Sequence, residues 1–362
     1  MRILVVNAGS SSLKLRLLAD DDAVVARRDL DATDGLVGEE ELAAALADLG
    51  PTDAVGHRVV HGGTRTAAAP VDEALVDELT ALTDLAPLHQ PPALAAMAVT
   101  ARVRPDVPAV ACFDTAFHAT LPAAAATYAL PGEWRERWGL RRYGFHGLSH
   151  AWAARRAAEL TGRSPAALRV VSCHLGAGAS LAAVAGGRSI DTTMGFTPLE
   201  GLVMATRSGS VDPGLVLWLQ TSGGLAAEEV ADGLEHRSGI RGLAGTADLR
   251  QVVERAEQGE EEAILALDVY AHRARAGVAA MVAALGGVDV LVLTGGVGEA
   301  SPVVRAAVIG GLGFLGLALD QERNRDAELD ADIGVTGAVP IYAVAAREDL
   351  QIAAEVRSVV AD

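Results

Sequence analysis

The sequence predicts an α/β fold with two domains. It contains 362 residues, half of them apolar, so the chain can bury a large core and exceeds the length of one typical domain. Two series of segments follow one another, and each begins with short apolar strands and continues into helices and further strands. No sequence repeat relates the two series, so their common order only suggests a duplication.

The first series occupies the N-terminal part of the chain. Runs of apolar residues predict strands near 2–6, 13–18 and 23–28, followed by a helix around 39–49. "DAVGHRVVHGG" predicts a strand that runs into a glycine turn, and "PAVACF" predicts a buried strand that ends in the polar residues "DTAFH". Two helical patterns separate these strands, at 71–85 and 93–104.

The second series begins near residue 141. It is expected to contain a short strand at "RRYGF", a helix opened by Ser149, and strands at 168–175, 179–184 and 188–191. Alanine-rich helices are predicted at 214–222, 225–235, 246–257 and 260–285. The strand "DVLVLTGG" and a helix from 302 restore the α/β alternation.

Charge and cysteine usage exclude several classes of protein. The net charge of -17 argues against nucleic acid or an anionic membrane as a partner, because binding to phosphate polymers needs an extended basic surface. No apolar run approaches the roughly 20 residues of a membrane span and no signal peptide is evident, which predicts a cytoplasmic protein. Cys112 and Cys173 end apolar runs without metal-ligand spacing, so we expect buried thiols and no disulfide framework.

Polar residues gather where predicted strands end. "NAGSSSLK" could hold a phosphate on its backbone N–H groups and hydroxyls, or could be an ordinary polar hairpin, and Lys14 within it is the only lysine of the chain. Arg58 lies on a strand between two histidines. Asp114 and His118 follow a buried strand, at the edge where open α/β sheets place their ligands, although Asp114 could simply cap the turn.

Further along the chain, histidine and glycine motifs indicate a second group of candidates. His146 and His150 have the i, i+4 spacing of a helical zinc pair, but the neighbouring glycines argue against a helix there, which leaves His146 in a loop. "CHLGAGAS" and "LTGGVGEAS" are glycine-rich turns after apolar strands and are suited to a nucleotide. Between them lies a long irregular stretch, 191–214, whose few charges include Glu200 and Arg207.

Taken in order, these motifs resemble the acetate kinase family. They are "VVNAGSSSLKL", "GHRVVHGG", "PLHQPPAL", "FDTAFH", "YGFHGLSH", "CHLGAGAS", "DTTMGFTPLEGLVMATRSGSVDP" and "TGGVGEAS". The resemblance implies two ribonuclease-H-like domains of the superfamily of sugar kinases, actin and heat-shock ATPases, with an interdomain active-site cleft. It also implies reversible transfer of the γ-phosphoryl group of ATP to acetate, which gives acetyl phosphate and ADP.

The resemblance also assigns residues to roles. The catalytic residues would be Asp114, Arg207, His146 and Arg58, and the acetate would contact Arg58, Val60, Leu88, Phe145 and Pro198. Asn7 and Glu348 match positions associated with Mg²⁺, for which Mn²⁺ is an alternative. The nucleotide would lie against Lys14, His174, Leu175, Gly176, Ala177, Gly178, Asp248, Leu249, Arg250, Gly296, Val297, Gly298, Glu299 and Ala300.

The family pattern further predicts how the chain is organised. An N-terminal domain would comprise 1–118 and 349–362, and a C-terminal domain for nucleotide binding and dimerisation would comprise 119–348. A homodimer is expected through the second domain, since the helices at 260–285 are apolar on more than one face. This sequence departs from the family at Ala177 and Ala300, where asparagine is usual, and at Gln90. The changes at Ala177 and Ala300 keep open a nucleotide-binding sensor without kinase activity. Pyrophosphate also stays open as the donor, and propionate as the acceptor because an apolar pocket discriminates weakly.

Overall fold

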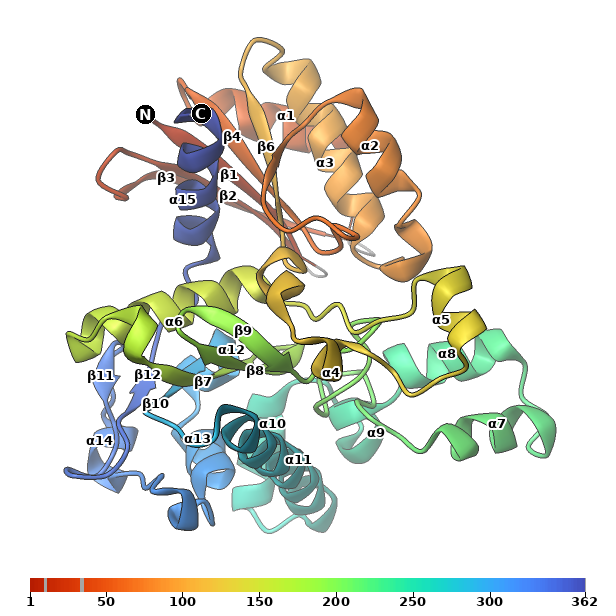
Figure 1. Ribbon diagram of the computed structural model, residues 1–362, viewed down its shortest axis with the longest axis vertical. Helices are drawn as coiled ribbons and strands as arrows, with labels where there is room; N and C mark the ends of the chain where they lie inside the picture. Colours follow the sequence, from red (N-terminus) through yellow and green to blue (C-terminus); the bar gives the residue numbers. More distant parts are fainter. Residues whose placement is uncertain (10–11, 33–35, 362) are drawn as a thin grey trace. The chain divides into compact units, whose positions relative to one another are not determined.

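The computed structural model describes residues 1–9, 12–32 and 36–361, which form two compact units. The first unit contains Met1–Thr120, Phe145–Trp152 and Arg347–Asp362, and the second contains Leu121–Gly144 and Ala153–Ala346. Both labelled ends of the chain lie in the first unit (Figure 1). None of the helices in the described part of the chain is long and apolar enough to cross a membrane.

The first unit is built on a six-stranded sheet with the order β3-β2-β1-β4-β6-β5. Its strands are β1 (Ile3–Ala8), β2 (Ser12–Leu18), β3 (Val24–Asp31), β4 (Ala54–Val59), β5 (Ala69–Pro70) and β6 (Ala109–Phe113). The strands β1, β2 and β3 form an antiparallel meander, whereas β1, β4 and β6 are parallel to one another. The carboxyl ends of three parallel strands therefore meet at one edge of this sheet.

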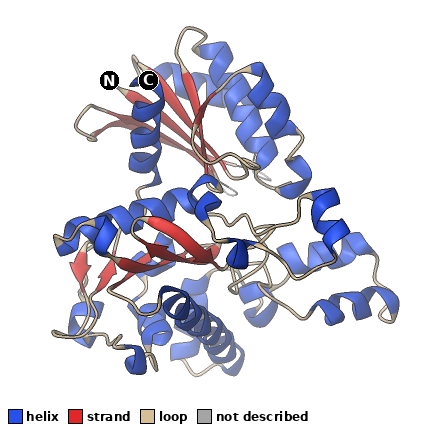
Figure 2. Ribbon diagram, in the orientation of Figure 1, coloured by secondary structure: helices blue, strands red, loops and turns tan. Residues whose placement is uncertain are grey.

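Helices cover both faces of the first sheet because its central strands are apolar on both sides (Figure 2). Leu4 and Val6 of β1 pack with residues of α1 (Glu39–Asp48) and α3 (Gln90–Val103). Their neighbours Ile3 and Val5 pack on the opposite face with α15 (Glu348–Ala361). The remaining helices of this unit are α2 (Glu73–Thr80), η1 (Thr83–Leu85) and η2 (Ala116–Thr120).

The close approach of α15 depends on a glycine in β4. A Cβ atom added to Gly56 would lie 2.5 Å from Cγ2 of Ile352 and 2.7 Å from Cγ2 of Val356. Such distances are far below van der Waals contact, so a larger residue would push the helix away from the sheet. The position of α15 matters because Glu348, a predicted metal position, is its first residue.

The second unit repeats this strand pattern. Its strands are β7 (Arg169–Leu175), β8 (Ala179–Ala185), β9 (Arg188–Thr192), β10 (Val290–Thr294), β11 (Ala331–Asp332) and β12 (Ile341–Ala343), in the order β11-β12-β10-β7-β8-β9. An antiparallel meander, β7 to β9, again pairs through its first strand with a parallel strand, β10, which in turn pairs in parallel with β12. Each unit thus has the ribonuclease-H-like arrangement, and the common order expected from the sequence is matched by a common topology.

Helices surround the second sheet as they do the first. The longest, α11 (Glu261–Leu285), packs against β7, β8 and β9 (Figure 1), where Gly277 leaves room for the side chain of Leu181. The other helices of the second unit are α4 (Ala123–Ala126), α5 (Gly132–Trp138), η3 (Pro165–Ala167), α7 (Pro213–Thr221), α8 (Ala227–His236), α9 (Gly239–Ala244), α10 (Leu249–Glu257), α12 (Gly295–Ala300), α13 (Pro302–Ile309), η4 (Gly313–Leu315) and α14 (Gln321–Arg325). One further helix, α6 (Gly147–Thr161), begins in the first unit and continues into the second.

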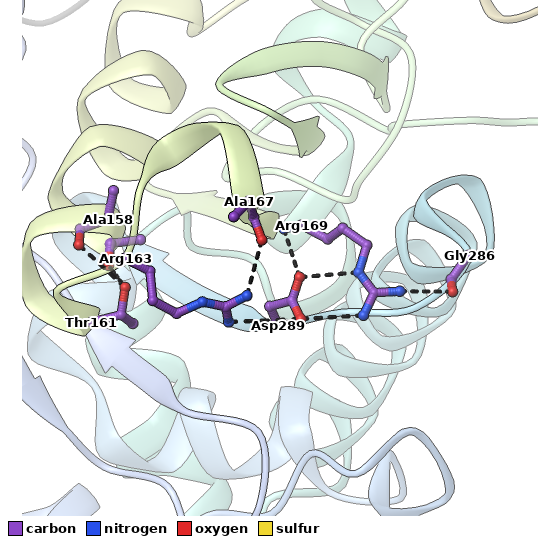
Figure 3. Close-up of polar contacts among 8 residues, drawn as sticks. Ala158, Thr161, Arg163, Ala167, Arg169, Gly286 and Asp289 are labelled. Atoms are coloured by element: carbon purple, nitrogen blue, oxygen red, sulfur yellow. Dashed lines mark hydrogen bonds and ion pairs between the residues drawn. The ribbon is translucent and has the colours of Figure 1, made fainter.

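An aspartate fixes the parallel pair at the centre of the second sheet (Figure 3). Asp289, which precedes β10, accepts hydrogen bonds from the backbone N–H of Arg169 at 2.9 Å and from its Nε at 3.0 Å. The same arginine donates to the carbonyl of Gly286, at the end of α11, and Arg163 lies 3.7 Å from the carboxylate. These contacts join the first residues of β7 and β10, whose other ends carry the glycine turns predicted to bind nucleotide.

Three predictions of local structure need correction. Residues 141–145 form no strand, because the N–H groups of 142–144 donate to the carbonyls of Ala126, at the end of α4, and Gly195 rather than to a neighbouring strand. The helix expected after Ser149 begins at Gly147, and the turn "GGVGEA" forms the short helix α12. The prediction of buried thiols is confirmed, since Cys112 and Cys173 are both free and 0% exposed.

Candidate active site

The edge formed by β1, β4 and β6 carries four of the predicted site residues. Asn7 and Arg58 are the second-to-last residues of β1 and β4, and Asp114 directly follows β6. Because parallel strands end at a common edge, these three side chains meet there, as ligand-binding residues do in open α/β sheets. Glu348 joins them from the N-terminus of α15.

Arg58 is the centre of the contacts in this group. Its Nε and Nη2 both donate to Oδ2 of Asp114, at 3.1 and 2.7 Å. Its Nη1 donates to Oδ1 of Asn7 at 3.2 Å and lies 3.6 Å from Oε2 of Glu348. The amide of Asn7 in turn donates to Glu348 at 2.7 Å. One guanidinium therefore orients two carboxylates and an amide, which we call the Arg58 network.

Burial and charge perturb the pKa values of Asp114 and Arg58 in the Arg58 network. Asp114 is fully buried, and this burial raises its pKa, with Glu348 adding to the effect and Arg58 opposing it. Burial alone would lower the pKa of Arg58, but the carboxylates of Asp114 and Glu348 hold it above its ordinary value. Two carboxylates facing one guanidinium leave an excess of negative charge in a water-poor environment, so a cation would be bound favourably there.

The donor atoms of the Arg58 network suit magnesium. Carboxylate and amide oxygens are the hard ligands that Mg²⁺ prefers, and the ion retains several waters, so Asn7 and Glu348 supply a sufficient protein share. Among the described residues, no group of three or more His, Cys, Asp or Glu side chains has a metal-binding arrangement.

His146 is held beside Asp114 by an unusual backbone. It has a φ of 55°, in the left-handed region, and its carbonyl accepts the first hydrogen bond of α6 from His150 at 2.9 Å. At the next residue, a Cβ added to Gly147 would lie 1.9 Å from the carbonyl oxygen of Asp114. Only glycine permits this approach, which places the predicted catalytic histidine one residue from the contact with Asp114.

Other histidines near this site are buried and neutral. Burial lowers the pKa values of His57, His61 and His118 to about 4 in each case. His118 lies 3.0 Å through Nε2 from the carbonyl of Phe145, which indicates the tautomer protonated at Nε2 because a carbonyl only accepts. The rings of His61 and Phe145 meet edge to face at 5.6 Å. These contacts support the segment that carries Phe145 and His146.

The remaining predicted residues of the first unit also take definite positions. Val60 and Phe145 are buried and Leu88 is half-buried, as apolar contacts require. Lys14 is exposed and is paired in register with Asn7 across β1 and β2. Ser10 and Ser11 of the proposed phosphate-binding hairpin lie outside the described residues.

The second unit contains a cavity of about 680 Å³ between its glycine turns and α10. Its walls include eight residues predicted to contact nucleotide, namely Gly176, Ala177, Asp248, Leu249, Arg250, Gly296, Val297 and Ala300. His174, Leu175, Gly178, Gly298 and Glu299 do not line it, and Leu175 is fully buried. Sequence reasoning missed the rest of the lining, which includes Ile240, Val253 and Tyr270.

Buried polar contacts set the shape of the glycine turn in this cavity. Gly295 has a φ of 79°, and a Cβ there would lie 2.8 Å from the carbonyl of Leu175. Arg305, only 2% exposed, donates to the carbonyls of Gly298 and Glu299 at 3.0 and 2.7 Å. The arginine thus caps the C-terminus of α12 and fixes the wall of the cavity.

Arg207 lies in the irregular stretch of the second unit. Its Nη1 donates to the carbonyl of Pro198 at 3.4 Å and contacts Sδ of Met204 at 3.8 Å. Burial lowers the pKa of Arg207, and the charge of Glu235 opposes this effect. A half-buried guanidinium held by a carbonyl is a favourable binding group for an anion, because its reduced exposure limits the water that competes for it.

Two solved structures share this architecture over nearly the whole chain. Acetate kinase from Porphyromonas gingivalis matches with a TM-score of 0.90 and 33% identity, over 99% of both chains. A propionate kinase from Francisella tularensis matches with a TM-score of 0.91 and 34% identity, again over 99% of both chains. The fold is therefore that of the acetate and propionate kinases.

Sequence comparison defines the family more closely. Acetate kinase from Trichormus variabilis is 49% identical over 311 residues, which cover 85% of this chain and 76% of that protein. Acetate kinase from Carboxydothermus hydrogenoformans is 40% identical over a 390-residue alignment that covers 98% of each chain. The model of the Acetokinase family matches residues 37–354. The chain belongs to the Acetokinase family.

Proposed function

We propose that this protein transfers the γ-phosphoryl group of ATP reversibly to acetate, giving acetyl phosphate and ADP, with Mg²⁺. The observation that carries the proposal is the Arg58 network, in which Asn7, Asp114 and Glu348 surround one arginine at a strand edge. Membership of the Acetokinase family and the nucleotide-sized cavity of the second unit support it.

The chemistry makes charge neutralisation the main task of the protein. With a carboxyl pKa of about 4, acetate is already ionised at neutral pH, so the acceptor needs no general base. The difficulty is to bring this anion to a phosphate that is itself anionic. In our proposal Arg58 holds the acetate carboxylate, and Arg207 stabilises the phosphoryl group during transfer. Asp114 orients Arg58 through two hydrogen bonds rather than transferring a proton.

His146 completes the set of donors to the phosphoryl oxygens. Its ring is carried by a backbone that the contact between Gly147 and Asp114 fixes in place. A donor that is already oriented needs no rearrangement when charge develops in the transition state. Lys14, which is paired in register with Asn7, supplies a compact charge to the phosphates of the nucleotide.

Asn7 and Glu348 would hold the Mg²⁺ ion, with Mn²⁺ as an alternative. When bound, the ion neutralises charge on the phosphates of the nucleotide. The protein's part is to present the two oxygen donors together, which the hydrogen bond from Asn7 to Glu348 achieves. Asp114 would lie behind them and retain Arg58 in its orientation.

The acyl group would contact Val60, Leu88, Phe145 and Pro198. An apolar pocket discriminates weakly, because one methylene is worth roughly 1–3 kcal/mol, so propionate is a second candidate acceptor. The similarity to the propionate kinase from Francisella tularensis specifically favours testing it. We also propose a homodimer that forms through the C-terminal domain, and a cytoplasmic location.

The direct test is acetate-dependent formation of ADP by the purified protein with Mg²⁺ and ATP. The expected result is ADP release that rises with acetate and falls to background without it, and propionate and butyrate give the acyl preference. Arg58→Ala should abolish most activity, whereas the matched control Arg102→Ala, at an arginine 58% exposed, should retain it. Nucleotide binding without acetate-dependent turnover would favour a sensor. Turnover with pyrophosphate but not with ATP would exclude ATP as the donor.

A further inference from the structure

A bridge of three side chains in the second unit has no role in the proposal so far. Tyr128 donates to one oxygen of the Glu200 carboxylate, and Arg142 donates to the other at 2.7 Å. The guanidinium of Arg142 also lies over the ring of Tyr128, at 5.5 Å from its centroid. We call this group the Glu200 bridge. Its members come from two segments, 128–142 and 193–201, that are far apart in sequence.

The Glu200 bridge holds the loop at 193–201 on both sides. Arg142 donates to the carbonyls of Thr193 and Met194 at 3.1 and 2.9 Å. The hydroxyl of Tyr128 accepts a hydrogen bond from the N–H of Phe196 at 2.9 Å. A Cβ on Gly195 would lie 1.7 Å from Oε2 of Glu200, so the loop folds tightly over the carboxylate. The bridge therefore determines the course of the loop rather than merely touching it.

This loop supports the guanidinium of Arg207. Pro198, whose carbonyl accepts from Nη1 of Arg207, lies two residues before Glu200. On the other side of Glu200, Gly201 exchanges hydrogen bonds with Ser210, at 3.1 Å through the serine hydroxyl and at 3.0 Å between backbones. Residues on both sides of Glu200 therefore contact the segment 207–210, Pro198 through the Arg207 side chain and Gly201 through Ser210.

The backbone of Arg207 is anchored independently of the Glu200 bridge. The hydroxyl of Thr206 donates to the carbonyl of Glu235 at 2.8 Å, and the N–H of Ser208 donates to the carbonyl of Leu234 at 3.0 Å. Loss of the bridge should therefore leave the backbone of Arg207 in place and disturb the support of its guanidinium through Pro198.

We propose that the Glu200 bridge is a positioning device for Arg207, with Tyr128 and Arg142 fixing Glu200 and its loop so that the Pro198 carbonyl orients the guanidinium. The inference rests on the proposed function, because it assigns Arg207 to the phosphoryl group. Tyr128, Arg142 and Glu200 are positioning residues, since they act through Pro198 and Arg207. An arginine that stabilises a transition state must be oriented in advance, and a small displacement lowers the rate strongly.

Tyr128 is the best point at which to break the bridge. Tyr128→Phe removes the hydroxyl, and with it the contacts to Glu200 and Phe196, but keeps the ring beneath Arg142. Burial and the hydrogen bond to Glu200 raise the pKa of the Tyr128 hydroxyl, so it remains a donor throughout the range in which the enzyme is assayed. The matched control is Tyr342→Phe, a buried tyrosine of β12 outside the site.

The experiment is a double-mutant cycle in kcat between Tyr128→Phe and Arg207→Ala, at saturating ATP and acetate. Tyr128→Phe alone should lower kcat about tenfold, with the KM for ATP changed less than twofold because Tyr128 does not line the nucleotide cavity. In the Arg207→Ala background the same change should lower kcat less than twofold, because the guanidinium to be oriented is gone. Tyr342→Phe should leave kcat unchanged in both backgrounds.

Glu200→Gln provides a second variant in case Tyr128→Phe folds poorly. It keeps the size of the side chain but offers only one oxygen to two donors. We therefore expect the same loss of kcat in the wild-type background and the same small effect in the Arg207→Ala background. An equal loss of kcat in both backgrounds, or an unchanged kcat in folded single variants, would overturn the positioning role. A wild-type protein without acetate-dependent ADP formation would instead overturn the proposed function and this inference with it.

Discussion

Removal of the Arg58 side chain should cost stability as well as activity. Arg58→Ala leaves Asp114, which is 0% exposed, without its partner and leaves Glu348 close to the same buried region. At a separation of about 4 Å and an effective dielectric constant of about 20, the attraction between Arg58 and one carboxylate is about 4 kcal/mol. Breaking a buried pair by removing one member costs about 3–5 kcal/mol, so we expect a loss of this size near neutral pH.

The loss of stability in Arg58→Ala should increase with pH. Burial already raises the pKa of folded Asp114 above the unfolded value of about 4, and removal of Arg58 should raise it further. A raised folded pKa favours the protonated folded state, so the variant is least destabilised below about pH 4. Its deficit should grow as the pH rises from about 4 to the raised pKa of the folded carboxyl group, because over this range the unfolded chain loses a proton that the folded variant retains.

The assay is chemical denaturation of wild type and variant at several pH values, with the transition followed by circular dichroism. Arg102→Ala is the matched control, because its pair with Glu39 at 3.0 Å has side chains that are 58% and 71% exposed. Exposed pairs of this kind contribute less than about 1 kcal/mol. Equal stabilities of the two variants across the pH range would refute the reasoning from the Arg58 network.

Three other predictions concern catalysis and assembly. Arg207→Ala should lower kcat by roughly 10³-fold, which is the scale on which a transition-state arginine acts in phosphoryl transfer. Arg207→Lys should recover only part of this loss. A loss of kcat within tenfold for Arg207→Ala, measured by steady-state kinetics, would contradict the assignment. Val60→Ala should shift kcat/KM from acetate toward propionate by removing apolar contact worth roughly 0.8 kcal/mol per methylene, and an unchanged ratio would place Val60 outside the pocket. Light scattering at micromolar concentration should find a dimer, since α11 exposes Ile264 and Leu265 at 40% and 56%; a monomer would count against it.

The sequence was most informative where strands end. Asn7, Arg58 and Asp114 each follow an apolar run, and the parallel pairing of β1, β4 and β6 brings such ends together. Glu348 could be placed with them only by family resemblance, since nothing local in "AAREDL" indicates which sheet its helix covers. The packing of α15 on Gly56 supplies that information.

Local sequence patterns could not predict the contacts between loops that are distant in the sequence. The alternation in "RRYGF" favours a strand, but Arg142 contacts Thr193, Met194 and Glu200, and these tertiary bonds replace the ladder. The same applies to Tyr270 of α11, which lines the cavity predicted to bind nucleotide, although its helix shows only an apolar pattern. The glycine turn at 295–300 forms the short helix α12, whose last carbonyls accept hydrogen bonds from Arg305. The glycine pattern alone does not indicate this contact.

The left-handed backbone at His146 has a consequence for mutagenesis of this site. Any L-residue with a Cβ atom meets a steric cost of about 1–2 kcal/mol at positive φ, and histidine is among the residues found there most often. An alanine therefore loses the imidazole and also this tolerance of positive φ, so its phenotype mixes two causes. Asparagine, like histidine, adopts this conformation more readily than most non-glycine residues, and its side chain is polar but does not titrate. His146→Asn and His146→Gly therefore separate the contribution of the imidazole ring from the effect of the left-handed backbone. Only the two variants together measure the contribution of the imidazole to activity.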